Sequence, residues 1–538
     1  MLAGVVAAAD GPVATVTQRL AGLNDVVSGA YSPPDVQVAA GPGYVVELVN
    51  LAARIWRTAA GVSAQELRTE QLDDFFGRRG DRLTDPRILY DAPTGRWFAS
   101  ISDVDSGSVL LAVSAGVDPT AGWTVSSFPA AGCADQPRLG LADGVVVLAA
   151  DLFADCKTAG ATLGGELWVV NKQQLLEGSK APAYTSYGPD AAYASFAPVQ
   201  SLSPTSTEYV VSVDEPTSRV VHLLTVDGIP PDPVSVREVA SPSLNPLLRP
   251  AFAAQPPDAA GKPQLLIETN DDRVLDSVWE NGRLWFSANT GCVPAGDILL
   301  RTCARLVELS TVTNTVDWDT DLFRAGAHVF FPAIRPDAAG NLVVVYAESG
   351  RKLPLTLAAI GRTPEGSLTQ PVVIARTAGS FLGDRYGDYF GAARDPVDPT
   401  VVWVAGAAGT DVRGGRGWTT ALASVAVTGT GVLPPVTLTA PPPGVRALSA
   451  TARLGGRIRL AYRALDDGSA IRSIVTVRRR QSVVFRATTA PATLRSDQFY
   501  YVFWRPAKRL RGPFTFCVRS VSAGGVQSPE SCAAITLR

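Results

Sequence analysis

The stretch that decides the fold runs from Gly383 to Gly406 and reads GDRYGDYFGAARDPVDPTVVWVAG. It begins with polar residues and continues as a strand of small and aromatic residues. It then turns between Asp395 and Pro399 and ends as a hydrophobic strand that contains Trp403. Pro and Asp favour turns, and apolar runs on both sides of a turn favour paired strands. The stretch therefore predicts a β-hairpin.

The same order of features recurs along the chain. Hairpins of this kind begin at Asp85-Pro86-Arg87, at Asp135 with Pro137 and Arg138, and at Asp272-Arg273. A unit of roughly 50 to 70 residues that repeats in this way is typical of a radial β architecture. We count seven units from Pro33 onward. The expected fold class is therefore all-β, a seven-bladed β-propeller with six blades as the alternative, followed by a small β-sandwich domain.

The last unit shows only three strands where the others show four. Ring closure in propellers commonly takes the missing strand from the other end of the chain, because this removes exposed sheet edges. Val13–Gln18 is the strand that we expect to pair with the outer edge of the last blade. Deletion of residues 1–20 is then expected to lower the stability by several kcal/mol.

The composition divides the chain into parts. Residues 10–432 hold the repeats, 433–444 form a Pro-rich linker, and 445–538 show the short alternating strands of a sandwich domain. From Val436 to the end there are 17 Lys and Arg against 4 Asp and Glu, whereas the preceding part has 31 against 46. The basic tail either binds a polyanion or presents a solvated face that attracts the acidic first domain.

The six cysteines fall into three close pairs, which predicts the disulfides Cys133–Cys156, Cys292–Cys303 and Cys517–Cys532. Disulfides persist in oxidising compartments, so a secreted or cell-surface location is expected, with buried free thiols as the alternative. Residues 1–9 resemble a signal-peptide remnant, or else form an Ala-rich terminus. No apolar run reaches the ~20 residues needed to span a bilayer.

No cofactor or metal is expected. The chain has no C-x-x-C motif and its two histidines, His222 and His328, lie far apart in the sequence, which disfavours a zinc site. The weaker alternative is calcium, which prefers oxygen ligands and could be held by Asp395 and Asp398 or by Asp271-Asp272. Asp is also common in ordinary turns. The tryptophans of the strand patterns are expected to pack the blades: Trp56, Trp97, Trp168, Trp285 and Trp403.

A family resemblance rests on three further stretches: DPRILYDAPTGRWFAS (85–100), DDRVLDSVWENGRLWFS (271–287) and PAIRPDAAGNLVVVYAESG (332–350). Together with the stretch that contains Trp403, they resemble secreted bacterial β-propellers of the sialidase-like, BNR-repeat superfamily. The tail resembles fibronectin type III and immunoglobulin-like modules. The chain departs from sialidases because it has no intact S-x-D-x-G-x-x-W box and no F-R-I-P motif, and because sialidases have six blades. The resemblance therefore implies the fold and does not transfer the catalytic residues as a set.

In a propeller the first strand of each blade lines the central channel, so polar residues at the starts of these strands should meet at one mouth. The candidate ligand-binding residues are Asp35, Arg87, Arg138, Arg273 and Arg385. The candidate catalytic residues are Asp85, Asp135, Asp272, Tyr386 and Asp388.

Three interpretations of this cluster stay open. Arginines bind a carboxylate or polyol ligand through charge-assisted hydrogen bonds. Paired carboxylates act as acid and base in glycoside hydrolysis, for which the sialidase resemblance implies Tyr386 or Tyr389 as nucleophile. Alternatively, neighbouring Asp and Arg residues form a belt of ion pairs that only ties the blades together.

The leading functional hypothesis is a secreted or surface binding module for a carbohydrate or protein ligand at the channel mouth. The alternatives are a sialidase-like glycoside hydrolase and a purely structural surface module, and no nucleic-acid partner is expected. At least two of the four arginines should be free for ligand. Arg138→Ala is then expected to weaken binding by about 1.5 to 3 kcal/mol while leaving the fold intact.

Three segments of the sequence lack a regular strand pattern. The connections 241–262 and 73–83 lack a strand period, and long irregular loops in compact domains are often functional. They either help to cover the ligand face or are disordered. The Gly-rich, basic stretch from Arg413 to Arg416 is expected to be a hairpin tip, because it lacks the Lys-Ser/Thr ending of a phosphate-binding loop.

Overall fold

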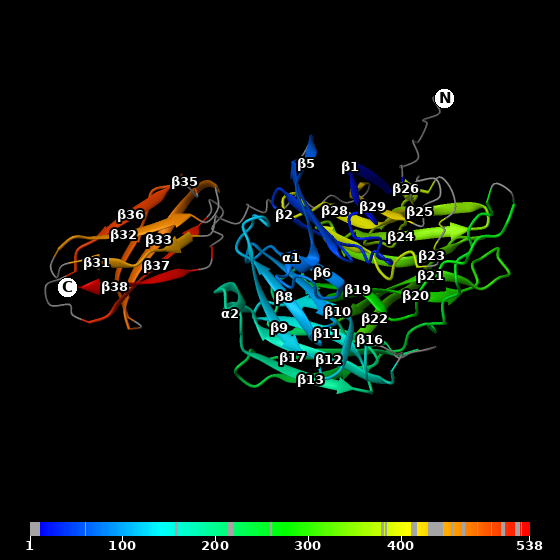
Figure 1. Ribbon diagram of the computed structural model, residues 1–538, viewed down its shortest axis with the longest axis horizontal. Helices are drawn as coiled ribbons and strands as arrows, with labels where there is room; N and C mark the ends of the chain where they lie inside the picture. Colours follow the sequence, from blue (N-terminus) through cyan, green and yellow to red (C-terminus); the bar gives the residue numbers. More distant parts are fainter. Residues whose placement is uncertain are drawn as a thin grey trace, which may run out of the picture. The chain divides into compact units, whose positions relative to one another are not determined.

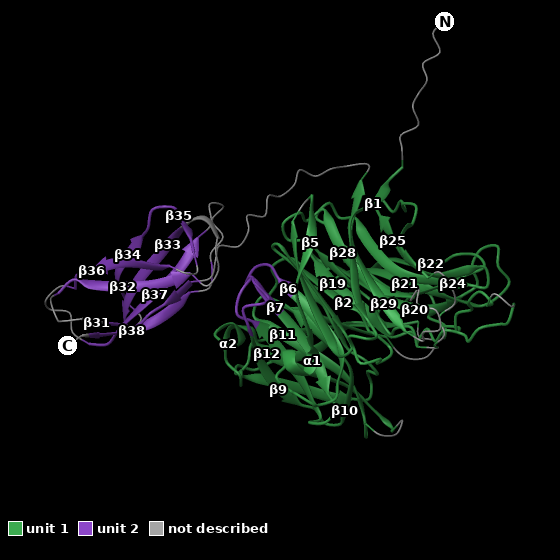
Figure 2. Cartoon of the chain, turned by 45° about the horizontal axis from the view of Figure 1, so that its top comes forward, with its two compact units in different colours: residues 1–89, 98–113, 123–436 green, residues 90–97, 114–122, 437–538 purple. Residues whose placement is uncertain are grey.

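The structure is a computed structural model. It describes residues 11–537 apart from 60, 157–159, 214–218, 259–260, 378–380, 382, 384, 410–416, 429–444, 453–455, 465–467, 481, 496–497, 507–511, 522–527 and 529. The expected signal-peptide remnant, the linker 433–444 and the hairpin tip at 413–416 lie outside the described residues. The chain divides into two compact units, one of residues 1–89, 98–113 and 123–436 and the other of residues 90–97, 114–122 and 437–538 (Figure 2).

The first domain is built of antiparallel sheets that follow one another along the chain (Figure 1). The first three groups are β2 (Gln37–Gly41), β3 (Tyr44–Val49), β4 (Ala52–Ala59) and β5 (Val62–Gln71); β6 (Leu83–Asp91), β7 (Arg96–Asp103), β8 (Ser108–Ser114) and β9 (Trp123–Pro129); and β10 (Cys133–Leu141), β11 (Val145–Phe153), β12 (Thr162–Asn171) and β13 (Tyr184–Asp190). Within each group, consecutive strands are hydrogen-bonded neighbours.

The next groups repeat this order. They are β14 (Ala197–Pro198), β16 (Glu208–Val213), β17 (Val221–Asp227) and β18 (Ser235–Ala240); β19 (Val274–Glu280), β20 (Arg283–Cys292), β21 (Arg301–Ser310) and β22 (Thr315–Leu322); and β23 (His328–Pro336), β24 (Leu342–Gly350), β25 (Leu353–Arg362) and β26 (Val372–Arg376). The short strand β15 (Gln200–Ser201) pairs in parallel with both β10 and β19 and so joins their two groups into one sheet. Two short helices, α1 (Leu72–Phe75) and α2 (Lys172–Leu176), follow β5 and β12.

The last sheet of the first domain has the order β1-β29-β28-β27. It is formed by β27 (Gly391–Arg394), β28 (Val401–Gly409), β29 (Trp418–Thr428) and the N-terminal strand β1 (Val13–Asn24). The register of β1 runs from Val13 opposite Thr428 to Asn24 opposite Thr419, antiparallel to β29. The prediction that an N-terminal strand pairs with the outer edge of the last unit is therefore confirmed. The strand extends beyond Gln18, to Asn24.

The first strand of every group lines one narrow central cavity, which makes the domain a β-propeller. The lining residues come from β2, β6, β10, β14, β19, β23 and β27, with Gln200 of β15. The inner strands approach closely, and a Cβ added at Gly391 of β27 would lie only 2.6 Å from the backbone nitrogen of Val38 on β2. Glycine is needed there because the backbones of the two inner strands nearly touch, and any side chain would collide with the neighbouring strand.

The inner and middle strands, such as β7, β8, β11 and β24, are buried over most of their length, since each sheet packs between two neighbours. The outer strands β5, β13, β18 and β22 are mostly exposed or half-buried. The five tryptophans that the sequence assigns to blade packing are all buried, with exposed fractions of 0% to 6%: Trp56, Trp97, Trp168, Trp285 and Trp403. Their packing role is confirmed. The three predicted disulfides, Cys133–Cys156, Cys292–Cys303 and Cys517–Cys532, are all present in the structure.

A buried glutamate holds the seam at which the N-terminal strand meets the first sheet. Glu47 of β3 is fully buried and accepts hydrogen bonds from the backbone N–H of Leu23 on β1 (3.1 Å) and from the hydroxyl of Thr420 on β29. Burial raises the pKa of its carboxyl to about 7, against the lowering effect of these hydrogen bonds. One side chain thus connects the first sheet to β1, the edge strand of the last sheet, and to β29, the strand beside it.

This glutamate predicts a pH dependence of stability. A carboxyl whose pKa is higher in the folded than in the unfolded chain stabilises the fold at low pH, and that contribution is lost as the pH rises. With an ordinary value of 4.5 and a folded value of about 7, the loss falls between these two pH values and is on the order of 3 kcal/mol. Urea unfolding at pH 5 and pH 8 should show a smaller pH effect in Glu47→Gln than in the unaltered protein. Equal pH effects in both would contradict the role of Glu47.

The tail domain contains two sheets of its own. One has the order β30-β32-β36, and the other has β31-β38-β37-β33-β34 with β35 paired to β33. The strands are β30 (Val445–Ala447), β31 (Ala450–Ala452), β32 (Ile458–Ala464), β33 (Gly468–Arg479), β34 (Ser482–Thr488), β35 (Ala492–Leu494), β36 (Phe499–Trp504), β37 (Phe514–Val521) and β38 (Ser531–Leu537). Buried residues of both sheets, among them Leu460, Val475, Trp504 and Phe516, belong to one hydrophobic core.

Candidate functional site

The candidate site lies at the mouth of the central channel, where the inner strands begin. Three residues there have positive φ angles: Asp35 (50°) before β2, Asp85 (61°) in β6 and Gln136 (44°) in β10. Left-handed backbone is uncommon for residues other than glycine, and Asp is among the side chains that tolerate it best. This turn of the backbone therefore helps to explain Asp35 and Asp85, whereas in β10 the left-handed residue is Gln136 and not the candidate Asp135.

These strand starts are connected from sheet to sheet by carboxylates. The Asp388 N–H donates to Asp35 Oδ1 (2.8 Å), and the Asn50 side chain donates to Asp35 Oδ2 (2.7 Å). Asn50 Oδ1 in turn accepts from the Asp85 N–H (2.8 Å), and Asp85 Oδ2 accepts from the Gln136 N–H (3.2 Å). The last sheet and the first three sheets are thus joined in a chain of hydrogen bonds, as the structural-belt interpretation expects.

The same carboxylates are close enough to raise one another's pKa. Burial, followed by repulsion from Asp388 and Asp85, raises the pKa of Asp35 well above its usual range. Burial and Asp85 raise the pKa of Asp135 to about 7, and burial raises that of Asp388 to about 6 against the opposing effect of Arg385. Near neutral pH the mouth therefore holds a mixture of protonated and ionised carboxyl groups.

Two arginines lie among these carboxylates. Arg273 forms ion pairs with Asp151 (2.5 Å) and Asp271 (2.8 Å), and its side chain is 13% exposed. Arg385 pairs with Asp388 (2.6 Å) and, more loosely, with Glu268 (3.6 Å). The side chains of Arg385 and Glu268 are each 41% exposed, so this pair forms the accessible part of the mouth.

The other two candidate arginines are buried below the mouth. Arg138 is 4% exposed and contacts Asp151 (3.3 Å), the Ser195 hydroxyl and the Phe196 carbonyl. Arg87 is 7% exposed, donates to the carbonyls of Pro137 and Leu275, and lies 3.5 Å from the centre of the Tyr389 ring. With Arg335 they line the axial cavity, whose volume is only about 30 Å³.

The expectation of at least two free arginines is therefore wrong. Arg138, Arg273 and Arg385 all have carboxylate partners, and Arg87 is enclosed by carbonyls and an aromatic ring. The physical reason is that the inner strands almost touch at the axis, so a long side chain at a strand start meets its own sheet or the next one before it meets solvent. Only Arg385 keeps substantial exposure.

The tyrosine candidates are also placed differently from the expectation. Tyr386 and Tyr389 are both fully buried. The Tyr386 hydroxyl donates to the Ala407 carbonyl and that of Tyr389 to the Pro86 carbonyl. Burial raises the pKa of each hydroxyl far above its usual range. A nucleophile needs access to substrate and an activated hydroxyl, so the nucleophile role expected from the sialidase resemblance is wrong for both.

Several mouth residues were missed by the sequence reasoning. Asp151 interrupts the otherwise apolar run of β11 and lies opposite Asp135 in the register of β10 and β11, and a charge inside such a run is a signal that could have found it. Glu268 lies in the irregular segment that precedes β19. Its backbone forms an isolated parallel β-bridge with that of Arg385, which brings the two residues together. Nothing in its local sequence distinguishes it. Of the candidates from the sequence, Asp272 is 1% exposed and offers little surface to a ligand.

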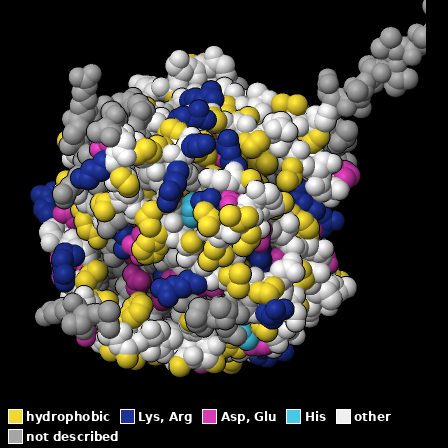
Figure 3. All heavy atoms as spheres, turned by 90° about the vertical axis from the view of Figure 1, so that its right-hand side faces the viewer, with side chains coloured by type: hydrophobic (Ala, Val, Ile, Leu, Met, Phe, Trp, Pro, Cys, Tyr) yellow, Lys and Arg dark blue, Asp and Glu magenta, His cyan; other side chains and the backbone are white. Residues whose placement is uncertain are grey.

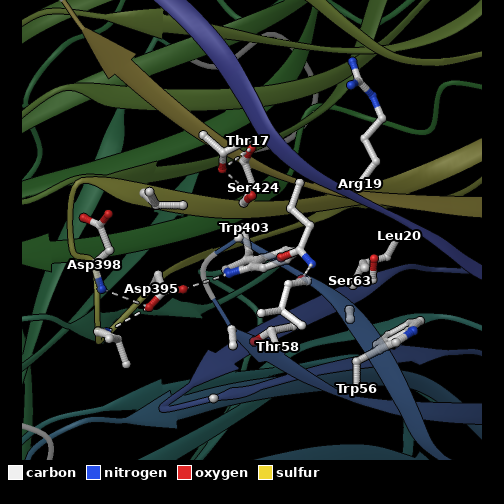
Figure 4. A pocket seen from close by; sticks show the side chains of 18 of the residues that line it. Thr17, Arg19, Leu20, Trp56, Thr58, Ser63, Asp395, Asp398, Trp403 and Ser424 are labelled. Atoms are coloured by element: carbon white, nitrogen blue, oxygen red, sulfur yellow. Dashed lines mark hydrogen bonds between the residues drawn. The ribbon is translucent and has the colours of Figure 1, made fainter.

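A wider groove lies elsewhere on the same domain, beside the β2–β3 and β27–β28 turns. These turns are at the ends of β2 and β27 that lie opposite the mouth. Figure 4 shows the side chains that line the groove. Its volume is about 1040 Å³, and β1, β4, β5 and β28 supply much of its lining. Asp395 and Asp398, the calcium candidates, are in its wall. Asp395 accepts from the Trp403 indole (3.0 Å) and from the Val397 N–H (2.8 Å), and Asp398 accepts from the Thr400 N–H and hydroxyl.

These carboxylates therefore serve the turn in which they lie. Asp271 is likewise engaged, with Arg273. Within the described part of the chain, the one group of acidic, histidine or cysteine side chains with metal-like spacing is Cys517, Glu530 and Cys532, and its cysteines form a disulfide. Calcium remains a hypothesis from sequence that no contact of the described residues favours.

Hydrophobic, basic and acidic side chains are interspersed over the face shown in Figure 3. Among the described residues, no helix is both long and apolar enough to cross a membrane.

Comparison with known proteins finds distant similarity to solved structures. No protein-family profile and no curated protein matches the chain. A solved structure of a protein of unknown function from Dyadobacter fermentans is 14% identical, covering 77% of this chain and 99% of that chain at a TM-score of 0.36. The phage phi92 endosialidase is 8% identical, covering 76% and 69% at a TM-score of 0.37.

A subtype N10 neuraminidase-like protein of A/little yellow-shouldered bat/Guatemala is also 8% identical. The similarity covers 66% of this chain and 99% of that chain at a TM-score of 0.34. Similarities of this strength assign no activity to the present chain.

Proposed function

We propose that this chain is an exported, seven-bladed β-propeller with a C-terminal sandwich domain, and that its channel mouth binds an uncharged carbohydrate. The blade count rests on the four-stranded groups that begin with β2, β6, β10, β14, β19, β23 and β27, the last completed by β1. For the domain boundaries we propose those expected from the sequence, 10–432 and 445–538. Export is supported by the three disulfides, which persist in oxidising compartments.

The observation that carries the proposal is the exposed Arg385–Glu268 pair above a cluster of buried carboxyl groups. Ionised carboxylates accept hydrogen bonds and protonated ones donate them. With pKa values of about 6 and 7, Asp388 and Asp135 offer both near neutral pH. Sugar hydroxyls donate and accept as well, so a polyol satisfies such a mouth in either state.

The charge of the mouth distinguishes an uncharged sugar from an acidic one. Carboxyl groups outnumber arginines there, and three of the four arginines are already paired with carboxylates. An anionic ligand would be repelled by this excess of carboxyl groups, whereas a neutral polyol would not. The expectation from sequence of an anionic or polyol ligand is thus narrowed to the polyol.

A glycan-binding screen tests this proposal. Binding of a neutral glycan is expected, and Arg385→Ala should weaken it by about 1.5 to 3 kcal/mol, the usual contribution of hydrogen bonds to charged groups. Arg237→Ala is the matched control, because Arg237 is 63% exposed and paired with Asp227 outside the mouth. Titration calorimetry with the best glycan measures both. If no neutral glycan binds, or if Arg385→Ala binds as well as Arg237→Ala, the proposal fails.

A second candidate, glycoside hydrolysis, is favoured by one observation. Burial and Asp85 raise the pKa of Asp135 to about 7, so a substantial fraction of this carboxyl is protonated at neutral pH, as a general acid requires. The same glycans, offered as fluorogenic glycosides, distinguish the two candidates. Turnover that is lost in Asp135→Asn supports hydrolysis, whereas binding without turnover supports the binding module.

A further inference from the structure

The tail domain presents an exposed sheet face composed of aromatic and arginine side chains. In β36, the side chains of Phe499, Tyr501 and Phe503 are 56%, 45% and 47% exposed. The intervening Tyr500 and Val502 and the final Trp504 pack against or belong to the domain core. Because side chains alternate between the two faces of a strand, the three exposed rings lie in a row on one face.

The neighbouring strands place arginines on the same face. Arg459 lies opposite Phe503 and Arg463 opposite Phe499 in the register of β32 with β36. Arg446 of β30 lies opposite Arg463. The buried Ile458, Leu460 and Tyr462 alternate with these arginines and point into the core.

Two arginines stack on the rings, and in the described part of the chain neither forms an ion pair with an acid. The guanidinium of Arg457 lies 4.1 Å from the centre of the Phe503 ring, and that of Arg459 lies 4.8 Å from the Tyr501 ring. None of β30, β32 and β36 contains an Asp or a Glu. Stacking keeps the planar, positively charged groups next to the rings and leaves their N–H donors available for an anion.

Such a face is unusual for a solvated surface. Exposed apolar side chains that form a contiguous patch often mark interaction sites. Here the row lies within a tail that has 17 basic and 4 acidic residues from Val436 to the end. A solvated, purely structural face would not need three half-exposed rings. A partner of opposite charge that also offers flat apolar surfaces would complement both features.

We propose that the β30-β32-β36 face binds an acidic polysaccharide. The apolar faces of pyranose rings pack on Phe499, Tyr501 and Phe503. Uronate carboxylates or sulfate groups of the chain receive paired hydrogen bonds from Arg457, Arg459 and Arg463, in the geometry that guanidinium favours. The three disulfides indicate an exported protein, and outside the cell such polysaccharides are abundant polyanions. This site is separate from the proposed neutral-sugar site of the propeller.

The test uses the full chain and polygalacturonate as probe, with neutral dextran as the uncharged comparison. Binding to polygalacturonate alone is expected, and it should weaken as salt is raised, because the contacts are ionic. Arg457→Gln/Arg459→Gln and Tyr501→Ala/Phe503→Ala should each weaken binding by about tenfold or more. The matched control is Arg472→Gln/Arg479→Gln, which removes the same charge from exposed positions of β33 in the other sheet. It should bind almost as the unaltered chain does.

Several outcomes would overturn the proposal. Equal losses in the two arginine double variants would mean that net charge alone is responsible. Tighter binding of oligothymidylate or of phosphatidylglycerol vesicles than of polygalacturonate, lost in the same face variants, would assign the face to nucleic acid or to membrane instead. If none of these polyanions binds, the face does not have this function. Circular dichroism of each variant verifies that the tail remains folded. None of these results depends on whether the channel mouth binds a neutral glycan.

Discussion

Deletion of residues 1–24, which removes β1, is expected to lower the free energy of unfolding by several kcal/mol, one of the largest effects predicted for this protein. The deletion removes all the β1 residues that pair with β29 between Thr428 and Thr419. It also removes Leu23, which is fully buried and whose N–H serves the buried carboxyl of Glu47. The loss therefore combines an exposed sheet edge, a lost apolar contact and an unpaired buried acceptor.

The matched control is deletion of residues 1–10, which leaves β1 intact and should change the urea midpoint little. Leu23→Ala gives an intermediate variant, with an expected loss of about 2 to 5 kcal/mol for a fully buried leucine. An unchanged midpoint after deletion of 1–24 would mean that β1 contributes nothing to closure.

Replacement of Arg138 by Met is expected to destabilise the propeller by about 3 to 5 kcal/mol, the usual cost of removing one partner of a buried ion pair. The guanidinium of Arg138 contacts Asp151, Ser195 and Phe196, and all three lose that donor within the protein. Met keeps most of the side-chain volume, so the effect reports the charge and hydrogen bonds rather than a cavity.

The control for this variant is Arg237→Met, because the pair Arg237–Asp227 is exposed. Exposed pairs contribute about 0 to 1 kcal/mol, so its melting temperature should scarcely move. The ligand-site interpretation of Arg138 expects the reverse, an intact fold with weakened binding. A stable Arg138→Met that has lost affinity for a glycan would revive that interpretation and contradict the buried-pair argument.

The sequence by itself determined the features that depend on local chemistry. Strand period, turn residues and the missing fourth strand were enough to predict the β-propeller and the pairing of the N-terminal strand, because both follow from the need to bury alternating side chains and to cover an open edge. The three disulfides were predictable since each pair of cysteines is close in the chain. The five packing tryptophans followed from their places in the strand patterns.

Only the tertiary structure decided the state of each polar side chain at the channel mouth. The sequence placed Asp and Arg at the strand starts and left binding, catalysis and a structural belt open. Which applies depends on how strands pack within a blade and against the next blade. This packing buried Arg138 against Asp151 of its own sheet and enclosed Tyr386 and Tyr389. It left Arg385 and Glu268 exposed.

The tail illustrates the same division. Its excess of arginine was visible in the sequence, and so was the alternation of its strands. That Arg459 would lie opposite Phe503 required the register of two strands that are about 40 residues apart, which side-chain period alone does not fix. Local patterns determine which face a side chain takes, and only the packing of distant segments determines what it meets there.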